Sequence, residues 1–437
     1  MTGQQTLIAR AALGVLAGAS SFAALSSPRL QRLTAPRFDR VVTAAFLVSR
    51  LGLFSIIFLV FRLTPRGDIP AYYWTEARNV QEGLLPYRDF ASSYAPLHPY
   101  LDSLTIALWH TPLVIILLAI LIEAALLPLW LRFGRTLLAE QQLRTGALLY
   151  LASAVSLQFV TIDGQDTVII GVLLTLALYH LAKQRTLFSG ASVGTAVAAI
   201  KFLPLIYAPA FFLAIPRRWR WAAGFLLPVL AVYGAFTAMR LPIFTPLRLE
   251  GNIKSAGNLP FLVESVFGVT LPSRLWDALL LAVFAGIFLV VVRASRNSGA
   301  PARLRVIAFA TAAVTLALLL FSKKSWPPYL MLSFFPICLL VDVRRRVQTL
   351  GFVFFSLVAV IEHSYWASLL HELTAQELHQ GLLSGQPTYL VFLGLQILLA
   401  AGYGWLLAAS VGRIASSPEA TLPTETAPEP LAAASHS

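Results

Sequence analysis

The residues best placed to do chemistry lie in one polar interval, residues 63–110. It follows an apolar run from Val42 to Phe61 and holds a cluster of aromatic residues and five carboxylates, Asp68, Glu76, Glu82, Asp89 and Asp102. The preceding run is long enough to span a bilayer. A carboxylate held at the mouth of such a helix can accept a proton at the boundary between water and lipid. We therefore predict chemistry at this boundary.

Asp68 is the first carboxylate after the apolar run. It precedes Pro70 and opens a helix-like stretch from Ile69 to Gln81 that Gly83 ends. This pattern predicts that Asp68 caps the helix, which would orient its carboxylate and keep it ionised. A cap can be purely structural, but we expect Asp68 to be a general base as well. The same interval offers candidates for substrate contacts, which would otherwise be structural residues or an aromatic belt: Tyr72, Tyr73, Glu76, Asp89, Tyr94 and His98.

The apolar interval 187–215 has basic residues at both ends, which predicts that the chain enters the membrane and returns. Each leg has only about 14 residues, or roughly 21 Å of helix, against a hydrocarbon core of about 30 Å. Pro204 breaks the helix after Lys201. We expect a short helical hairpin whose tip lifts Lys201 towards the outer half of the membrane. There Lys201 would either form an anion site or snorkel to the interface.

A second basic cluster, Lys323 and Lys324, precedes Tyr329 in a short loop on the same side as the acidic interval. Lysines in an outer loop oppose the positive-inside trend, so we predict that these three residues bind a phosphate; the alternative is ordinary solvated charge. Asp163 and Gln165 lie in a tight turn between two apolar runs, as a simple turn or as substrate contacts. A sugar phosphate leaves as a stable anion, so its transfer needs cations and one base. These residues match that inventory.

The composition excludes an ordinary soluble domain. Hydrophobic residues make up 57% of the 437 residues and charged residues 12%, whereas soluble chains carry about 25% charged residues. We predict an all-α polytopic membrane protein of about 12 transmembrane helices with a large first extracytoplasmic loop. The lipid bilayer is then the partner, and the net charge of +13 does not indicate nucleic acid. Besides the hairpin, the expected spans lie near 43–62, 111–131, 146–162, 166–182, 222–239, 275–292, 306–321, 329–342, 349–366 and 388–410.

Charge predicts the orientation of the chain. With 63–110 outside, the inner segments collect twenty of the thirty-three basic residues, which agrees with the positive-inside rule. We expect residues 1–415 to form one transmembrane domain and residues 416–437 a disordered cytoplasmic tail. Residues 7–26 can be an extra span, an interfacial helix or a poor signal peptide. The sequence contains no DxD, HExxH or Cys/His cluster, so we expect neither a metal site nor another cofactor.

The order of these motifs resembles the polyprenyl-phosphate-sugar-dependent glycosyltransferases of the GT-C superfamily, most closely glycosyltransferase family 87. The resemblance covers about residues 43–345. It rests on Asp68 with Tyr72, on the run Gly83-x-x-Pro86-Tyr87-x-Asp89-Phe90…Tyr94-x-Pro96, on Gly164-Gln165, on Lys201-x-x-Pro204, on Arg217-Arg218-Trp219-Arg220 and on Ser322…Tyr329. In that family the position after Gly-Gln is commonly Asn-like, whereas this chain has Asp166 followed by Thr167.

The resemblance implies a GT-C-like bundle in the bacterial cytoplasmic membrane, with an extracytoplasmic active site and Asp68 as the catalytic base. It implies that a hexose such as mannose moves from a polyprenyl phosphate to a lipid-linked or cell-envelope glycan. The alternative from another class is a transporter or lipid flippase, which twelve helices and a lysine within the membrane would suit. The acidic outer loop and the lack of a detectable internal repeat argue against it.

Overall fold

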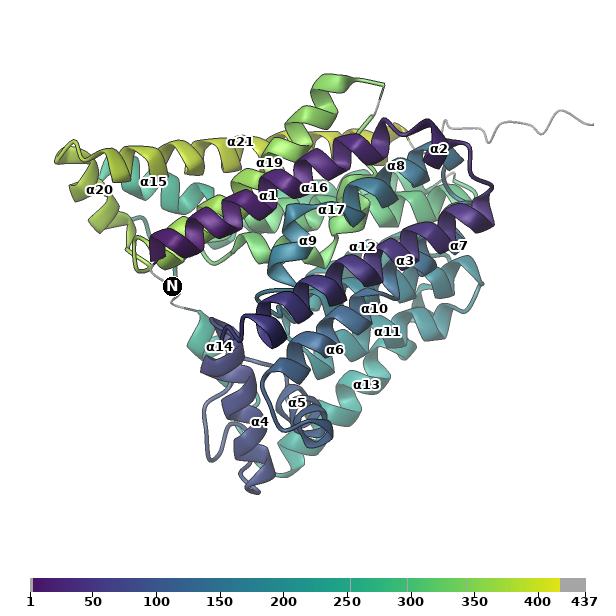
Figure 1. Cartoon of the computed structure of the whole chain (residues 1–437). Helices are drawn as coiled ribbons and strands as arrows, with labels where there is room; N and C mark the ends of the chain where they lie inside the picture. Colours follow the sequence, from purple (N-terminus) through teal and green to yellow (C-terminus); the bar gives the residue numbers. More distant parts are fainter. Residues whose placement is uncertain (1–2, 252, 297, 343, 417–437) are drawn as a thin grey trace, which may run out of the picture.

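The computed structural model describes residues 3–251, 253–296, 298–342 and 344–416 (Figure 1), so the predicted tail lies outside the described residues from 417 onward. Over this range the chain is helical and forms no β-strand. The first half contains α1 Gly3–Leu25, α2 Pro28–Gln31, α3 Ala35–Phe54, α4 Trp74–Gln81, α5 His98–Leu108, α6 Leu113–Glu123, α7 Leu126–Gly134, α8 Glu140–Leu151, α9 Ala154–Phe159, α10 Thr167–Ala182, α11 Thr186–Ala199 and α12 Ala208–Ala214. The second half contains α13 Arg218–Ala238, α14 Thr245–Glu250, α15 Leu259–Phe267, α16 Ser273–Arg296, α17 Ala300–Phe321, α18 Phe334–Cys338, α19 Arg346–Ser368, α20 Ala375–Leu383 and α21 Pro387–Ser416.

Among the described residues, eight helices are long and apolar enough to cross a membrane. They are α1, α3 with its π-helical extension to Val60, α6 continued by α7, α13, α16, α17, α19 and α21. The shorter apolar helices are α10, α11 and the segment Leu203–Ala214. This architecture is that of a multi-pass membrane protein, as predicted. It also favours the reading of residues 7–26 as part of a spanning helix, because α1 meets the same criterion.

Besides the span at 111–131, which consists of α6 continued by α7, two of the predicted spans are not single helices. The span predicted at 146–162 consists of α8 and α9 with a break at Ala152, and the span predicted at 329–342 consists of a 3₁₀ turn, Pro327–Leu332, followed by the five-residue α18. Prolines explain the second break, since Pro327 and Pro328 open the turn and remove backbone donors. Hydropathy alone does not detect such breaks, because the segments remain apolar.

A buried ion cluster compensates the break after α8. The carbonyl oxygens at a helix C-terminus lack partners within the helix. The guanidinium of Arg50 donates to the carbonyl oxygen of Leu151 at 2.5 Å and to the hydroxyl of Ser156 at 2.7 Å. Glu123 accepts hydrogen bonds at 2.6 Å from the hydroxyls of Tyr150 and Ser156. These two ionisable side chains therefore hold α8 and α9 together inside the bundle.

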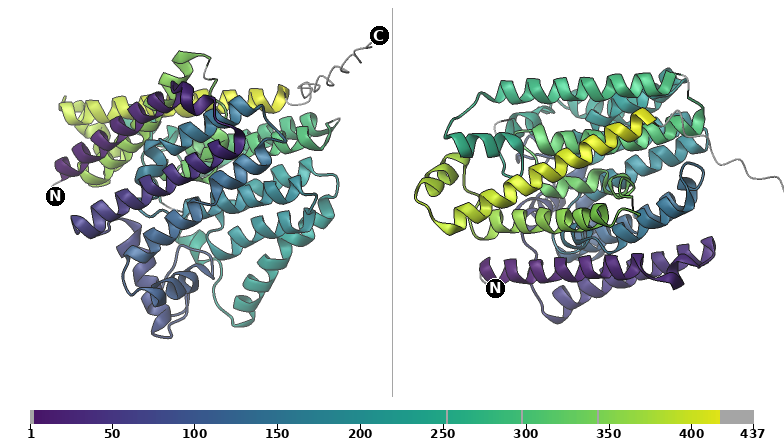
Figure 2. Two further views of the ribbon diagram at one scale, coloured as in Figure 1. Left: turned by 45° about the vertical axis from the view of Figure 1, so that its right-hand side comes forward. Right: turned by 90° about the horizontal axis from the view of Figure 1, so that it is seen from above.

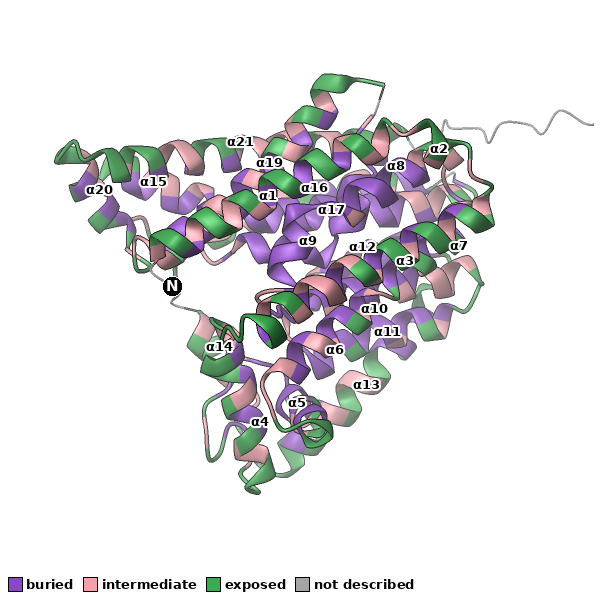
Figure 3. Cartoon of the chain, viewed as in Figure 1, coloured by how far each residue is buried: buried purple, intermediate pink, exposed green. Residues whose placement is uncertain are grey.

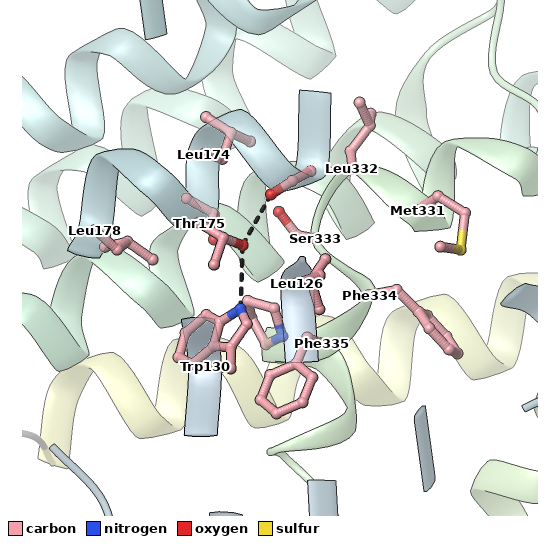
Figure 4. Close-up of a pocket in the computed structure, with 13 residues that line it drawn as sticks. Leu126, Trp130, Leu174, Thr175, Leu178, Met331, Leu332, Ser333, Phe334 and Phe335 are labelled. Atoms are coloured by element: carbon pink, nitrogen blue, oxygen red, sulfur yellow. Dashed lines mark hydrogen bonds between the residues drawn. The ribbon is translucent and has the colours of Figure 1, made fainter. Parts of the chain in front are cut away.

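The proline-rich segment after α17 packs directly on α10. A Cβ atom at Gly171 would lie 2.4 Å from the carbonyl oxygen of Met331, so only glycine permits this approach. Beside it, the indole of Trp130 donates to the hydroxyl of Thr175 at 3.1 Å and stacks on Phe335, with ring centroids 4.9 Å apart (Figure 4). The small cavity here is mostly apolar and belongs to the core.

The predicted hairpin at 187–215 is present. α11 ends at Ala199, and the chain returns through a 3₁₀ turn, Leu203–Tyr207, and α12. α11 runs parallel to α13 at very close range. A Cβ atom at Gly190 would lie 2.0 Å from the carbonyl oxygen of Trp221, and one at Gly194 would lie 2.2 Å from that of Phe225. Small residues four apart allow this contact between helix backbones. The tip of the hairpin is thus fixed by α13.

The bundle has two distinct ends. At one end, which we call the arginine-rich end, Arg135 pairs with Asp39 at 2.7 Å and Arg144 donates to the carbonyl oxygen of Gln31 at 3.1 Å. At the other end, which we call the Asp68 end, α4, α5 and α14 project from the lower left in Figure 1, with α2 and α7 at the opposite side. α17 and α9 are buried at the centre (Figure 3), and α1 runs along one outer edge (Figure 2).

Candidate active site

Asp68 stands at the start of the first helix of the Asp68 end. The stretch predicted as one helix is a π-helical turn, Ile69–Tyr73, continued by α4, and Gly83 follows it with a φ of +82°. The predicted cap is wrong, because the side chain of Asp68 makes no capping hydrogen bond. Its carboxylate instead accepts a hydrogen bond from the amide of Gln165 at 3.0 Å. The carboxylate is therefore oriented by the turn between α9 and α10.

Gly164 makes this meeting possible. It has a φ of +61°, and a Cβ atom would lie 2.7 Å from Ile69 and 2.9 Å from Ile116. Glycine adopts this conformation without steric cost and allows the turn to touch the helix start. Gln165 is thereby placed beside Asp68.

Lys201 lies at the tip of the hairpin, next to the same turn. Its ammonium is 2.8 Å from Asp166, 4.9 Å from the ring centroid of Tyr94 and 5.9 Å from that of Tyr329. Aromatic faces attract a cation at these distances. The backbone holds Tyr94 here, because the amide of the next residue, Ala95, donates to the carbonyl oxygen of Ile200 at 3.1 Å. Three predicted site residues from distant parts of the chain therefore meet.

Burial and nearby charge act in opposite directions on Asp68. Loss of water raises the pKa of the Asp68 carboxyl above its ordinary value, while the charge of Lys201 and the hydrogen bond from Gln165 lower it. The net direction is upward. A base with a raised pKa holds an abstracted proton better, provided that it remains ionised before the reaction.

His98 and Tyr73 lie behind Tyr94. The ring of Tyr94 stacks on His98 with centroids 4.4 Å apart, and Tyr73 meets both rings at 5.2 and 5.3 Å. His98 lies between two carboxylates, with Nδ1 3.3 Å from Asp102 and Nε2 3.5 Å from Asp166. All these side chains are buried. They pack against one another inside the protein, next to Lys201.

The remaining candidates of the acidic interval differ in their burial and in their hydrogen-bond partners. Glu76 is 4% exposed and accepts a hydrogen bond from Ser92 at 2.7 Å. Asp89 accepts from the amide of Leu85 at 2.8 Å and from Arg88, and so closes its own loop. Tyr72 is 48% exposed. Of these three, Tyr72 and Asp89 are exposed, and the Asp89 carboxylate is already occupied by hydrogen bonds within its own loop.

The two neighbouring lysines point to different partners. Lys323 pairs with Asp277 of α16 at 3.0 Å. Lys324 meets Glu250 of α14 and lies 5.0 Å from the ring centroid of Trp326. Burial and the charge of Lys201 lower the pKa of Lys324 to about 7, against the opposite effect of Asp68. The charges of Asp68 and Lys201 therefore both act on Lys324.

Asp163 binds a residue that the sequence did not identify as part of the site. Arg10 of α1 donates to both of its carboxylate oxygens, at 2.9 and 2.5 Å. The main-chain carbonyl of Arg10 accepts from Gln158 at 2.6 Å. An arginine within an apolar helix requires a partner, and this is the signal that could have drawn attention to Arg10. α1 thus anchors the turn that carries Gln165.

Comparisons with protein-family models, with curated proteins and with solved structures give no match to this chain. Among the described residues, no group of three or more His, Cys, Asp or Glu side chains is placed to hold a metal ion. The residues gathered around the turn before α10 are Asp68, Gln165, Asp166 and Lys201, with Lys324 nearby. This cluster combines the oriented carboxylate of Asp68 with lysines, one of which, Lys201, pairs with Asp166.

Proposed function

We propose that the protein is an integral-membrane glycosyltransferase that moves a hexose from a polyprenyl phosphate to a glycolipid or glycan acceptor. The observation that carries this proposal is one turn at an end of an apolar helical bundle, where Gln165 holds the Asp68 carboxylate and the next residue, Asp166, pairs with Lys201. One base and two cations are the groups that transfer of a sugar from a phosphate needs.

In the proposed reaction, the bond between the anomeric carbon and the phosphate oxygen breaks as the acceptor oxygen bonds to that carbon. The electron pair of the broken bond leaves with the phosphate, whose charge Lys201 and Lys324 stabilise. The acceptor hydroxyl gives its proton to Asp68. Gln165 keeps the carboxylate directed at that proton, so the reacting groups need little rearrangement.

The apolar surface of the bundle supports a lipid-linked donor. α14, which carries Glu250 against Lys324, exposes Phe244, Leu247 and Leu249 on or beside its helix. A prenyl chain dissolved in the bilayer would bring its phosphate to the level of these residues. A lysine is well suited to bind such a phosphate as a point charge.

The test is whether the purified protein in liposomes releases polyprenyl monophosphate from a donor labelled in both sugar and lipid. We expect lipid phosphate to appear as labelled sugar enters an acceptor lipid or glycan fraction. Movement of intact donor across the bilayer without cleavage would instead support a flippase. If donors of several sugars are neither cleaved nor moved across the bilayer, the proposal is wrong.

A further inference from the structure

Four ionisable side chains, alternately acidic and basic, form a row next to the proposed base; three of them are buried and the fourth, Lys201, is partly buried. In order they are Asp102, His98, Asp166 and Lys201, at successive N···O distances of 3.3, 3.5 and 2.8 Å. They come from three parts of the chain, namely α5, the turn before α10 and the tip of the hairpin. Buried ionisable side chains lose solvation by water, so each charge in this row depends on its neighbour.

The central carboxylate has two basic neighbours. Oδ1 of Asp166 faces Lys201, and Oδ2 of the same carboxylate faces His98. A carboxylate between two cations neutralises each only in part. If His98 were neutral, the whole charge of Asp166 would act on Lys201. The positive charge of Lys201 would then be neutralised by Asp166, and little of it would remain to attract a phosphate.

Asp102 favours the charged form of His98. Burial lowers the pKa of the imidazole, but the carboxylates of Asp102 and Asp166 more than offset this and raise it, while Lys201 opposes them. The other titratable groups around the ring are Glu76 on α4 and the phenols of Tyr73 and Tyr94. Stacking on Tyr94 fixes the plane of the imidazole between its two carboxylates.

We propose that His98 is a positioning residue: held protonated by Asp102, it shares the Asp166 carboxylate with Lys201 and so leaves part of the Lys201 charge for the donor phosphate. This inference rests on the proposed function. In this proposal His98 does not touch the substrate, because Asp166 and Lys201 follow it in the row and Lys201 is the residue that binds the phosphate. Its effect on phosphate affinity must pass through Lys201.

The experiment is a double-mutant cycle on the binding of undecaprenyl monophosphate to the full chain in nanodiscs. His98→Gln removes the charge but keeps a side-chain donor for Asp166, and we expect it to weaken binding on the order of tenfold. Asp102→Asn should weaken binding in the same direction. In a Lys201→Ala background, His98→Gln should change the dissociation constant by less than about twofold, because the residue through which it acts is gone.

A pH series separates the charge of His98 from a merely structural role. The ratio of affinities, wild type over His98→Gln, should fall towards one as the pH rises and the imidazole loses its proton. Titration of the phosphate and of Lys324 is common to both proteins and cancels in this ratio. His379→Gln is the matched control, because this histidine bonds to the carbonyl oxygen of Ser265 instead. Thermal unfolding monitors whether each variant is folded.

The outcomes separate the inference from the proposed function. Coupling between His98 and Lys201, together with the pH-dependent ratio, supports the inference. Additive effects of the two substitutions, or a ratio that does not change with pH, overturn it and leave the proposed function standing. A wild-type protein that does not bind the lipid phosphate overturns both. If His98→Gln does not fold, the same cycle with Asp102→Asn decides between these outcomes.

Discussion

Asp68 and Glu76 lie eight residues apart in one polar interval, yet their surroundings assign them different roles. Asp68 is part-buried and bonds to Gln165. Glu76 is enclosed, with Ser92 as its hydrogen-bond partner. Burial raises the pKa of Glu76 to about 7, against the lowering effects of Ser92 and His98. A carboxyl group that is enclosed and keeps its proton up to about neutral pH is a poor competitor of Asp68 for the role of base.

Glu76 should make the fold less stable as the pH rises. Its carboxyl group titrates near 4.5 when unfolded and near 7 when folded. Between these values the folded chain keeps the proton and the unfolded chain releases it, so rising pH favours unfolding by up to about 3 kcal/mol. Glu76→Gln should lose this dependence. Thermal unfolding of both proteins from pH 4.5 to 8 measures it, and identical pH profiles would contradict the burial of an ionisable Glu76.

At the scale of elements, the α11–α13 contact fixes the hairpin that carries Lys201. Gly194→Ala would force a Cβ atom against the backbone of Phe225 and should cost roughly 1–3 kcal/mol. Gly234→Ala, on α13 itself, meets no atom within 4 Å and serves as the control. We expect a lower unfolding temperature and weaker phosphate binding for Gly194→Ala only. Equal unfolding temperatures for the two variants would argue against this close packing.

α1 should be required for activity through its contact with the turn before α10. Arg10→Glu would place two carboxylates face to face and should lower turnover on the order of tenfold or more, because Asp163 then lacks its cation. The exchange Arg10→Glu with Asp163→Arg restores opposite charges and should recover much of the turnover. If the double variant is no better than Arg10→Glu alone, the pair does not position the turn.

Sequence reasoning succeeded for elements whose charges and prolines mark their ends. The hairpin follows from the basic residues around 187–215 and from Pro204, and it is present in the structure. The breaks at Ala152 and before α18 were missed, because tertiary contacts make them possible. Arg50 satisfies the free carbonyl group of Leu151 from another helix, and no pattern within residues 146–162 indicates this.

The sequence predicted which residues belong to the candidate site better than it predicted the contacts that they make. Asp68, Gln165 and Lys201 were each selected from local patterns, and the structure brings them together. Their partners lie far away in the sequence, as for Arg10 and Asp163, which are 153 residues apart. The separation of Lys323 from Lys324 has a local reason, since adjacent residues rarely point the same way.

At the scale of the whole molecule, the charge bias predicts that the Asp68 end lies outside the cytoplasm. Ala91 is exposed in the loop at this end, whereas its neighbour Ser92 is buried. In a Cys338→Ala background, Ala91→Cys should react with an impermeant thiol reagent in intact spheroplasts. Arg217→Cys, exposed just before α13, should react only after lysis. The reverse pattern would invert the topology and place the proposed site in the cytoplasm.

The most direct test of the central claim is turnover of the sugar–phosphate lipid by purified Asp68→Asn. Asparagine has the same size and can still accept the hydrogen bond from Gln165, but it cannot take the proton of the acceptor. We expect turnover to fall by about 10²–10⁴-fold with little change in affinity for undecaprenyl monophosphate. Asp39→Asn, whose carboxylate pairs with Arg135 at the arginine-rich end, is the control and should retain turnover. Near-normal turnover by Asp68→Asn would contradict the claim that this carboxylate is the base.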